Sequence, residues 1–151
     1  MKIYIASDHA GFHLKRQLIQ YLKVKGLEVE DLGAYVLDED DDYPDFVYPL
    51  ATKIALGKPG QDFGIVIGGS GNGEAIVANK VRGIRAAVVN SSNVQIARLA
   101  REDNDANVLA LGARFLSIDE AKMAVSVWLE SKFSGGRHEK RITKIRDLEK
   151  L

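Results

Sequence analysis

The chain is organised around the stretch Phe63-Gly64-Ile65-Val66-Ile67-Gly68-Gly69-Ser70-Gly71-Asn72-Gly73-Glu74. Its first five residues form an apolar run that is typical of a buried strand. Four glycines follow within residues 68–73, and the chain then runs directly into residues 75–80, which read as the start of a helix. The pattern therefore predicts a strand, a glycine loop and a helix in succession.

The glycine loop predicts an anion site. Glycines allow positive φ angles that turn several N–H groups onto one concavity, and the helix start adds its own unpaired N–H groups. The spacing of Gly68 and Gly73 matches the first half of a phosphate-binding P-loop, but Glu74 stands where that motif needs a lysine. The dinucleotide fingerprint G-x-G-x-x-G is also absent. Both observations disfavour a nucleotide-binding Rossmann protein.

The remaining interpretation is an anion hole with a carboxylate beside it. Proton abstraction next to a carbonyl group requires a positioned base and N–H donors for the enolate oxygen, and this stretch offers both. The plainer alternative is a glycine turn that only joins a strand to a helix. The pattern by itself leaves both interpretations open.

Composition excludes several classes of protein. The chain has 151 residues, of which 46% are hydrophobic, enough for one domain with a substantial core. The 21 basic and 21 acidic side chains balance, so there is no general attraction to nucleic acid or anionic membranes. The absence of cysteine excludes disulfides and thiolate metal sites. No apolar run suits a signal peptide or a membrane span, so we expect a cytoplasmic protein.

Strands and helices alternate along the chain. Strands are expected at residues 3–6, 27–32, 63–67, 84–89 and 108–111, and helices near 14–22, 45–56, 72–80, 93–101, 117–129 and from 138 onward. This order predicts an α/β fold with a doubly wound five-stranded parallel sheet, a Rossmann-like three-layer α/β/α arrangement and a C-terminal helical arm. We expect one domain over residues 1–151, with about 137–151 forming the arm.

The carboxyl ends of the strands are the expected site. Asp8 and His9, the glycine loop, and Asn90 each follow a predicted strand, so they should share one rim of the sheet. The acidic run Asp38–Asp42 is interpreted as a solvated loop. The alternative is an acidic metal site. It is disfavoured because contiguous carboxylates lack the alternate spacing of calcium loops and because no histidine is close in sequence.

Four motifs together resemble one family, the ribose-5-phosphate isomerase B family with its galactose-6-phosphate isomerase relatives. The motifs are Ala6-Ser7-Asp8-His9-Ala10-Gly11, Gly68–Glu74 with Ala78-Asn79-Lys80, residues 104–114 (NDANVLALGAR) and Gly136-Arg137-His138. The resemblance covers nearly the whole chain in order, and the four separate motifs make it specific. The resemblance implies an oligomer with sites shared between subunits, a homodimer or homotetramer, and an isomerase that needs no metal and no cofactor.

The resemblance also implies a reaction. Ribose 5-phosphate and ribulose 5-phosphate would interconvert through a cis-enediolate. One branch of the family has a cysteine base where this chain has Gly68; this chain is similar to the other branch, whose base matches Glu74. The N–H groups of the loop residues Gly69, Gly71, Asn72 and Gly73 would hold the enediolate oxygens, and Ser70 would assist there.

Further residues match the family by position. Asp8 would open the sugar ring, and His9, Arg137 and Arg141 would clamp the phosphate, with both arginines supplied by a partner subunit. Arg137 and Arg141 stand at i and i+4, so a helix would project both from one face, which suits a phosphate; a solvated basic face is the alternative. The remaining matched binding positions are Tyr43, Asn104 and Arg114. His13 and His138 are interpreted as surface or structural residues.

Asp103 departs from the family pattern. The family has a histidine at this position, implicated in ring opening, so Asp103 takes its place among the candidate catalytic residues. An aspartate does not titrate near neutrality unless its pKa is raised. A tetrose 4-phosphate, which forms no furanose ring, is therefore an alternative substrate, as is a hexose 6-phosphate. A non-catalytic sugar-phosphate sensor or paired subunit is a further alternative.

Overall fold

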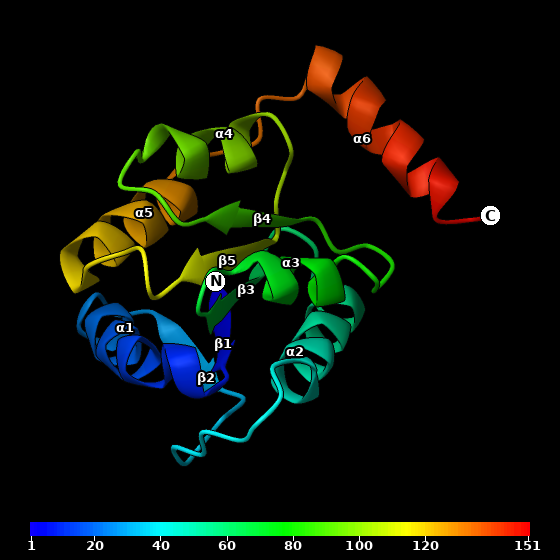
Figure 1. Ribbon diagram of the computed structural model, residues 1–151. Coiled ribbons are helices and arrows are strands. Elements are labelled where there is room, and N and C mark those ends of the chain that lie inside the picture. Colours follow the sequence, from blue (N-terminus) through cyan, green and yellow to red (C-terminus); the bar gives the residue numbers. More distant parts are fainter.

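The computed structural model describes all 151 residues and contains one parallel sheet (Figure 1). Its five strands lie in the order β2-β1-β3-β5-β4, and every neighbouring pair is parallel. The strands are β1 (Lys2–Ser7), β2 (Glu28–Asp31), β3 (Asp62–Gly68), β4 (Ala86–Val89) and β5 (Val108–Gly112). The predicted five-stranded parallel sheet is confirmed.

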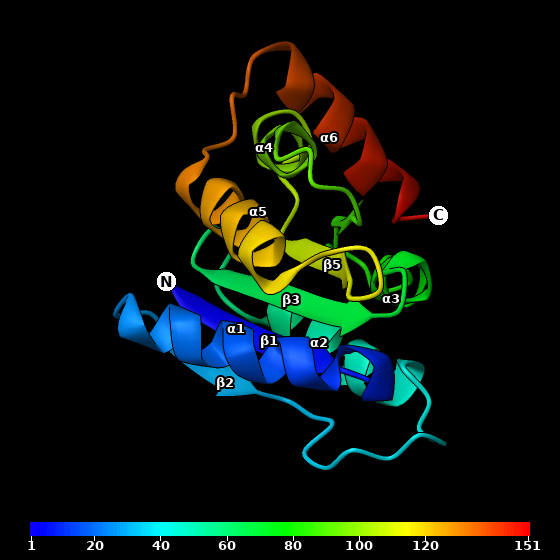
Figure 2. The same ribbon diagram turned by 60° about the vertical axis from the view of Figure 1, so that its left-hand side comes forward.

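Helices cover both faces of the sheet (Figure 2). They are α1 (Phe12–Val24), α2 (Pro44–Leu56), α3 (Asn72–Ala78), α4 (Gln95–Glu102), α5 (Ile118–Glu130) and α6 (Arg137–Leu148), with a 3-10 turn, η1 (His9–Gly11), before α1. One core cluster joins α1, α4 and α5 to the sheet, and a second joins α2 and α3 to the opposite face. The three-layer prediction is therefore correct.

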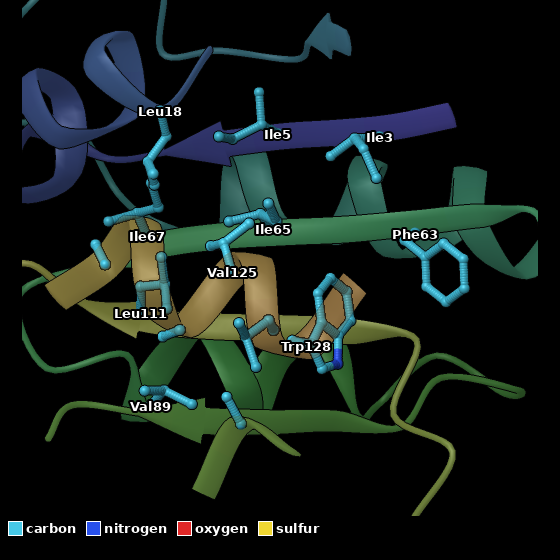
Figure 3. Close-up of a cluster of buried hydrophobic side chains, with 14 of the residues drawn as sticks. Ile3, Ile5, Leu18, Phe63, Ile65, Ile67, Val89, Leu111, Val125 and Trp128 are labelled. Atoms are coloured by element: carbon cyan, nitrogen blue, oxygen red, sulfur yellow. The ribbon is translucent and has the colours of Figure 1, made fainter. Parts of the chain in front are cut away.

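Alternation along the strands explains the two cores. Ile65 and Ile67 of β3 point to the α1/α5 face (Figure 3), whereas Val66 between them belongs to the α2/α3 face. Trp128 of α5 is fully buried and meets Phe63 edge-on with 5.5 Å between ring centroids, as expected for a core residue. A capping box between Ser117 and Glu120 begins α5.

Helix α6 lies outside the two cores for most of its length. Figure 1 shows it extending beyond α4 to the C-terminus. Ile142 is buried, but Ile145 is 42% and Leu148 66% exposed. The apolar side chains of this helix are thus only partly covered within one chain. No helix of the protein is both long and apolar enough to span a membrane.

The strand order creates a crevice between β1 and β3. From β1 the chain moves outward to β2, and it then returns to place β3 on the other side of β1. The connections that leave these two central strands therefore diverge to opposite faces of the sheet. In such folds ligands bind at this switch point, outside the carboxyl ends of the strands.

Candidate active site

Two loops meet at the switch point. Asp8 and His9 follow β1, and the glycine loop follows β3, whose pairing with β1 places Ser7 beside Ile67. Asn90 follows β4, and its side-chain amide donates to the Ser70 carbonyl at 3.1 Å. These three segments share one rim, as predicted from the sequence.

Glu74 is the buried carboxylate of this rim. It lies in the first turn of α3 and is only 3% exposed. Burial raises the pKa of Glu74, a hydrogen bond from its own backbone opposes the change, and the negative charge of Asp8 adds to the increase. A carboxylate that has lost hydration in this way binds a proton more strongly than an exposed one, which suits a general base.

Gly68 provides the space that Glu74 occupies. A Cβ atom built on Gly68 would overlap the Glu74 carboxylate. Only glycine leaves enough space here for the Glu74 carboxylate. Gly68, the last residue of β3, thus determines where the candidate base can lie.

The glycine loop is shaped by its own contacts. Gly71 has a φ angle of 82°, which favours glycine, and directly precedes α3. The Ser70 hydroxyl oxygen lies 3.2 Å from the Asn72 backbone nitrogen and accepts its hydrogen bond. The Asn72 N–H is thus already engaged within the loop, although the family resemblance implied that it would donate to the substrate.

Tyr43 and Arg114 both border the glycine loop. A Cβ on Gly73 would come within 2.7 Å of the Tyr43 ring, and one on Gly69 within 2.9 Å of Arg114 Nη1. The Arg114 backbone also donates to the Gly69 carbonyl at 3.0 Å. The structure therefore brings both predicted residues to the rim, Tyr43 beside Gly73 and Arg114 beside Gly69.

Asp8 has a structural contact as well as a free oxygen. Its Oδ1 accepts from the backbone nitrogens of Ala10 at 3.0 Å and Gly11 at 3.3 Å, which caps the η1 turn. The side chain is buried, and Oδ2 makes no hydrogen bond to the protein. One oxygen of Asp8 fixes the loop, and the other is available to a ligand.

The interpretation of Asp38–Asp42 as a solvated loop is wrong for Asp41. Its Oδ1 accepts from the His9 backbone nitrogen at 2.9 Å and from His9 Nδ1 at 2.7 Å. A histidine therefore does lie close in space, because the segment after β2 crosses the same rim as His9. Nothing local in the sequence distinguishes Asp41 from its acidic neighbours, so this contact could not be predicted.

Asp8, His9 and Asp41 each offer a ligand atom, and these atoms lie within 4.8 Å of one another, a geometry that a metal ion can use. However, Asp41 Oδ1 already accepts hydrogen bonds from both the backbone N–H and the ring N–H of His9. Hydrogen bonds and charge thus hold these side chains together without a metal ion.

A second set of predicted residues lies at the amino ends of the strands, on the opposite side of the sheet from the rim that holds Glu74. Asp103 follows α4, and the Asn104 carbonyl accepts from Arg85, which precedes β4, so both lie at the amino ends of the strands. His138 of α6 is buried, with Nε2 3.3 Å from Asp103 Oδ1. Arg137 flanks it on α6, and Arg141 is exposed one turn further on. One chain does not bring this set to Glu74.

The family model described as Ribose/Galactose Isomerase matches residues 3–145. The chain belongs to this family. The ribose-5-phosphate isomerase B of Mycobacterium leprae is 44% identical over 151 residues, which cover 99% of this chain and 91% of that protein.

Solved structures of the family agree with the fold. The ribose-5-phosphate isomerase B of Mycoplasma genitalium, solved with bound ribulose-5-phosphate, superposes with a TM-score of 0.94 at 44% identity and covers 99% of this chain and 96% of its own. The ribose-5-phosphate isomerase B of Clostridium thermocellum is 49% identical, with a TM-score of 0.91 and 99% and 98% coverage. The isomerase family predicted from the four motifs is thus confirmed.

Proposed function

We propose that this protein is an aldose–ketose isomerase that interconverts ribose 5-phosphate and ribulose 5-phosphate by proton transfer through a cis-enediolate. The observation that carries the proposal is the buried Glu74 carboxylate, packed against Gly68 and beside the glycine loop. Relatives at about 44% identity over nearly the whole chain are named for this activity, which supports the substrate.

The rim offers a group for each step. With ribose 5-phosphate in open form, Glu74 takes the proton from C2, the carbonyl oxygen on C1 gains the charge, and loop N–H groups of Gly69, Gly71 and Gly73 stabilise it. The Ser70 hydroxyl serves proton transfer between the two enediolate oxygens. Glu74 then returns its proton to C1, which leaves the carbonyl on C2. The free oxygen of Asp8 is the group proposed for ring opening.

A complete site requires a second copy of the chain. Asp103, Asn104, Arg137 and Arg141 are matched to the same pocket as Glu74, yet they lie at the opposite edge of the sheet within one chain. Strand β4 is an edge strand, and Ile76 and Leu148 near it are more than 60% exposed. We assign residues 1–151 to one domain whose arm, from about residue 137, reaches the partner in a homodimer or larger assembly. Its expected location is the cytoplasm, where phosphorylated sugars are metabolised.

Turnover measurements on the purified protein test the proposal. Ribose 5-phosphate, erythrose 4-phosphate and a hexose 6-phosphate are compared at equal concentration, and ribose 5-phosphate should give the highest kcat/KM. Asp103 in place of the family histidine favours erythrose 4-phosphate as the second candidate, because a tetrose 4-phosphate needs no ring opening. Absence of turnover with every substrate would instead identify a sensor or a subunit that requires a different partner.

A further inference from the structure

His9 and Asp41 form a contact that joins two distant segments of the rim. Asp41 Oδ1 accepts from the His9 backbone nitrogen at 2.9 Å and from His9 Nδ1 at 2.7 Å, across 32 residues of sequence. The Asp41 side chain is only 9% exposed, whereas the neighbouring Asp38, Glu39 and Asp40 are exposed. Asp41 is therefore the one member of its acidic neighbourhood that is directed inward onto a candidate substrate-binding residue.

This contact fixes the proton on His9. An ionised carboxylate only accepts hydrogen bonds, so Nδ1 must carry a hydrogen, and Nε2 is left without a partner in the protein. If His9 is neutral, Nε2 presents a lone pair, which repels a phosphate. If His9 is protonated, Nε2 becomes a charged donor, which binds a phosphate strongly.

The surroundings favour the protonated form. The hydrogen bond to Asp41 is the main cause that raises the pKa of His9; partial burial opposes it, the charges of Asp8 and Asp41 add to the increase, and Arg114 lowers it. These three side chains are the charged groups that face His9 from the η1 turn, the loop before α2 and the segment after β5. The two carboxylates outweigh the one guanidinium.

The placement of Asp41 carries a cost. Its second oxygen, Oδ2, is buried and has no hydrogen-bond partner, which is unfavourable for a carboxylate. An acidic residue that served only the solubility of the loop would point outward, as its neighbours do. Such local violations are expected where a group serves a binding site.

The scaffold holds the start of this loop rigidly. Lys15 is fully buried, and its ammonium group donates to Asp31 Oδ1 and to the Ala34 carbonyl, both at 2.6 Å. The loop ends at Tyr43, where Pro44 begins α2. Asp41 thus lies between two anchored parts of the chain, the contacts of Lys15 and the start of α2, and it precedes Tyr43 at the rim by two residues.

We propose that Asp41 is a positioning residue that keeps His9 in its charged form, with Nε2 free to bind the substrate phosphate. This inference rests on the proposed function, in which His9 is part of the phosphate clamp. Asp41 itself touches neither the reacting carbons nor the phosphate, so its effect should appear in phosphate binding far more than in the chemical step.

The test compares Asp41→Asn with Asp40→Asn in the full-length protein. Asparagine preserves the shape and one acceptor but removes the charge, and Asp40 is an exposed control in the same loop. NMR titration of the histidine side chains reports the protonation of His9 directly, whatever the substrate. Competition by inorganic phosphate, and kcat and KM for ribose 5-phosphate across pH, report its consequence.

In Asp41→Asn the titration midpoint of His9 should fall, and phosphate should bind about tenfold more weakly near neutral pH, with KM rising similarly and kcat changing less than about threefold. Asp40→Asn should match the unmodified protein. An unchanged His9 midpoint, or a loss confined to kcat, would overturn the proposal. If His9 shifts but ribose 5-phosphate is not turned over by the unmodified protein, the coupling stands and the proposed function fails. Thermal melting confirms that each variant is folded.

Discussion

Asp103 and His138 face each other at the amino edge of the sheet, with 3.3 Å between Asp103 Oδ1 and His138 Nε2. The family pattern has an imidazole at the position of Asp103, and here an imidazole from helix α6 lies against the aspartate that replaces it. His138, interpreted from the sequence as a surface or structural residue, is buried and paired. The pair therefore places the His138 imidazole beside the position at which the family resemblance implies one.

The Asp103–His138 pair predicts a substrate-dependent effect of Asp103→Asn. If the pair serves ring opening, the variant should lower kcat/KM for ribose 5-phosphate by about tenfold or more, because an acid–base partner is lost. Erythrose 4-phosphate, which enters without a ring to open, should be affected less than about twofold. Steady-state kinetics with both sugars measure the difference, with the exposed Asp147→Asn as control. Equal losses on both sugars would remove Asp103 from ring opening.

Replacement of Glu74 by glutamine should separate binding from chemistry. The amide keeps the size of the side chain but cannot accept the C2 proton, so turnover should fall by about 10³-fold or more while sugar-phosphate binding persists. Solvent deuterium exchange at C2, followed by NMR, should be abolished. Unchanged exchange would exclude Glu74 as the base.

The raised pKa of Glu74 predicts opposite pH effects on activity and on stability. The base must be ionised, so the acid limb of kcat/KM should lie above the ordinary value of 4.5 for a glutamate. Because the folded-state pKa is raised, the stability contributed by the protonated form is complete below the unfolded pKa and is lost as pH rises through the folded value.

Glu74→Gln, which never ionises, should therefore melt about 2–4 °C higher than the unmodified protein at pH 8. The difference should vanish near pH 4, where Glu74 is protonated. Calorimetry across this range measures it, and an equal difference at both pH values would show that charge is not the cause.

The overlap between a side chain at position 68 and Glu74 predicts strong coupling. Gly68→Ala should destabilise the protein by about 1–3 kcal/mol, because either the strand end or the carboxylate must move. In a Glu74→Ala background the same change should cost much less. Denaturant unfolding of the four proteins gives the coupling energy, and additive effects would show that Gly68 does not make room for Glu74.

The proposed sharing of sites between subunits predicts complementation between inactive variants. Glu74→Gln and Arg137→Ala proteins, unfolded and refolded together at equal amounts, should regain about one quarter of the unmodified activity, because half of the dimers are mixed and each holds one intact site. Refolding each variant alone provides the control. No recovery, with mixed dimers verified by differential tagging, would show that Glu74 of one subunit and Arg137 of the other do not form one site.

The sequence was sufficient to predict the layers of the fold and the loops that lie together at the rim around Glu74. Apolar runs such as Ile65–Ile67 and the glycines after them are local signals, and the switch-point rule places the loops that follow β1 and β3 together. The family resemblance identified the chemistry, which the local patterns had left open between an anion hole and a turn.

Residues brought together by distant segments were not predictable. Asp41 looked like its acidic neighbours, because nothing local distinguishes the one carboxylate that meets His9 from those that face solvent. The Asp103–His138 contact likewise joins the end of α4 to α6 across an irregular segment. In both cases the tertiary path of a connection, which has no periodic sequence signal, determines the partner.

The fit of Glu74 into the space left by Gly68 also limits how this family can change over time. A side chain at position 68 would meet the carboxylate of residue 74, so any larger residue at the end of β3 requires a shorter side chain at position 74. Positions 68 and 74 are therefore expected to change together rather than independently.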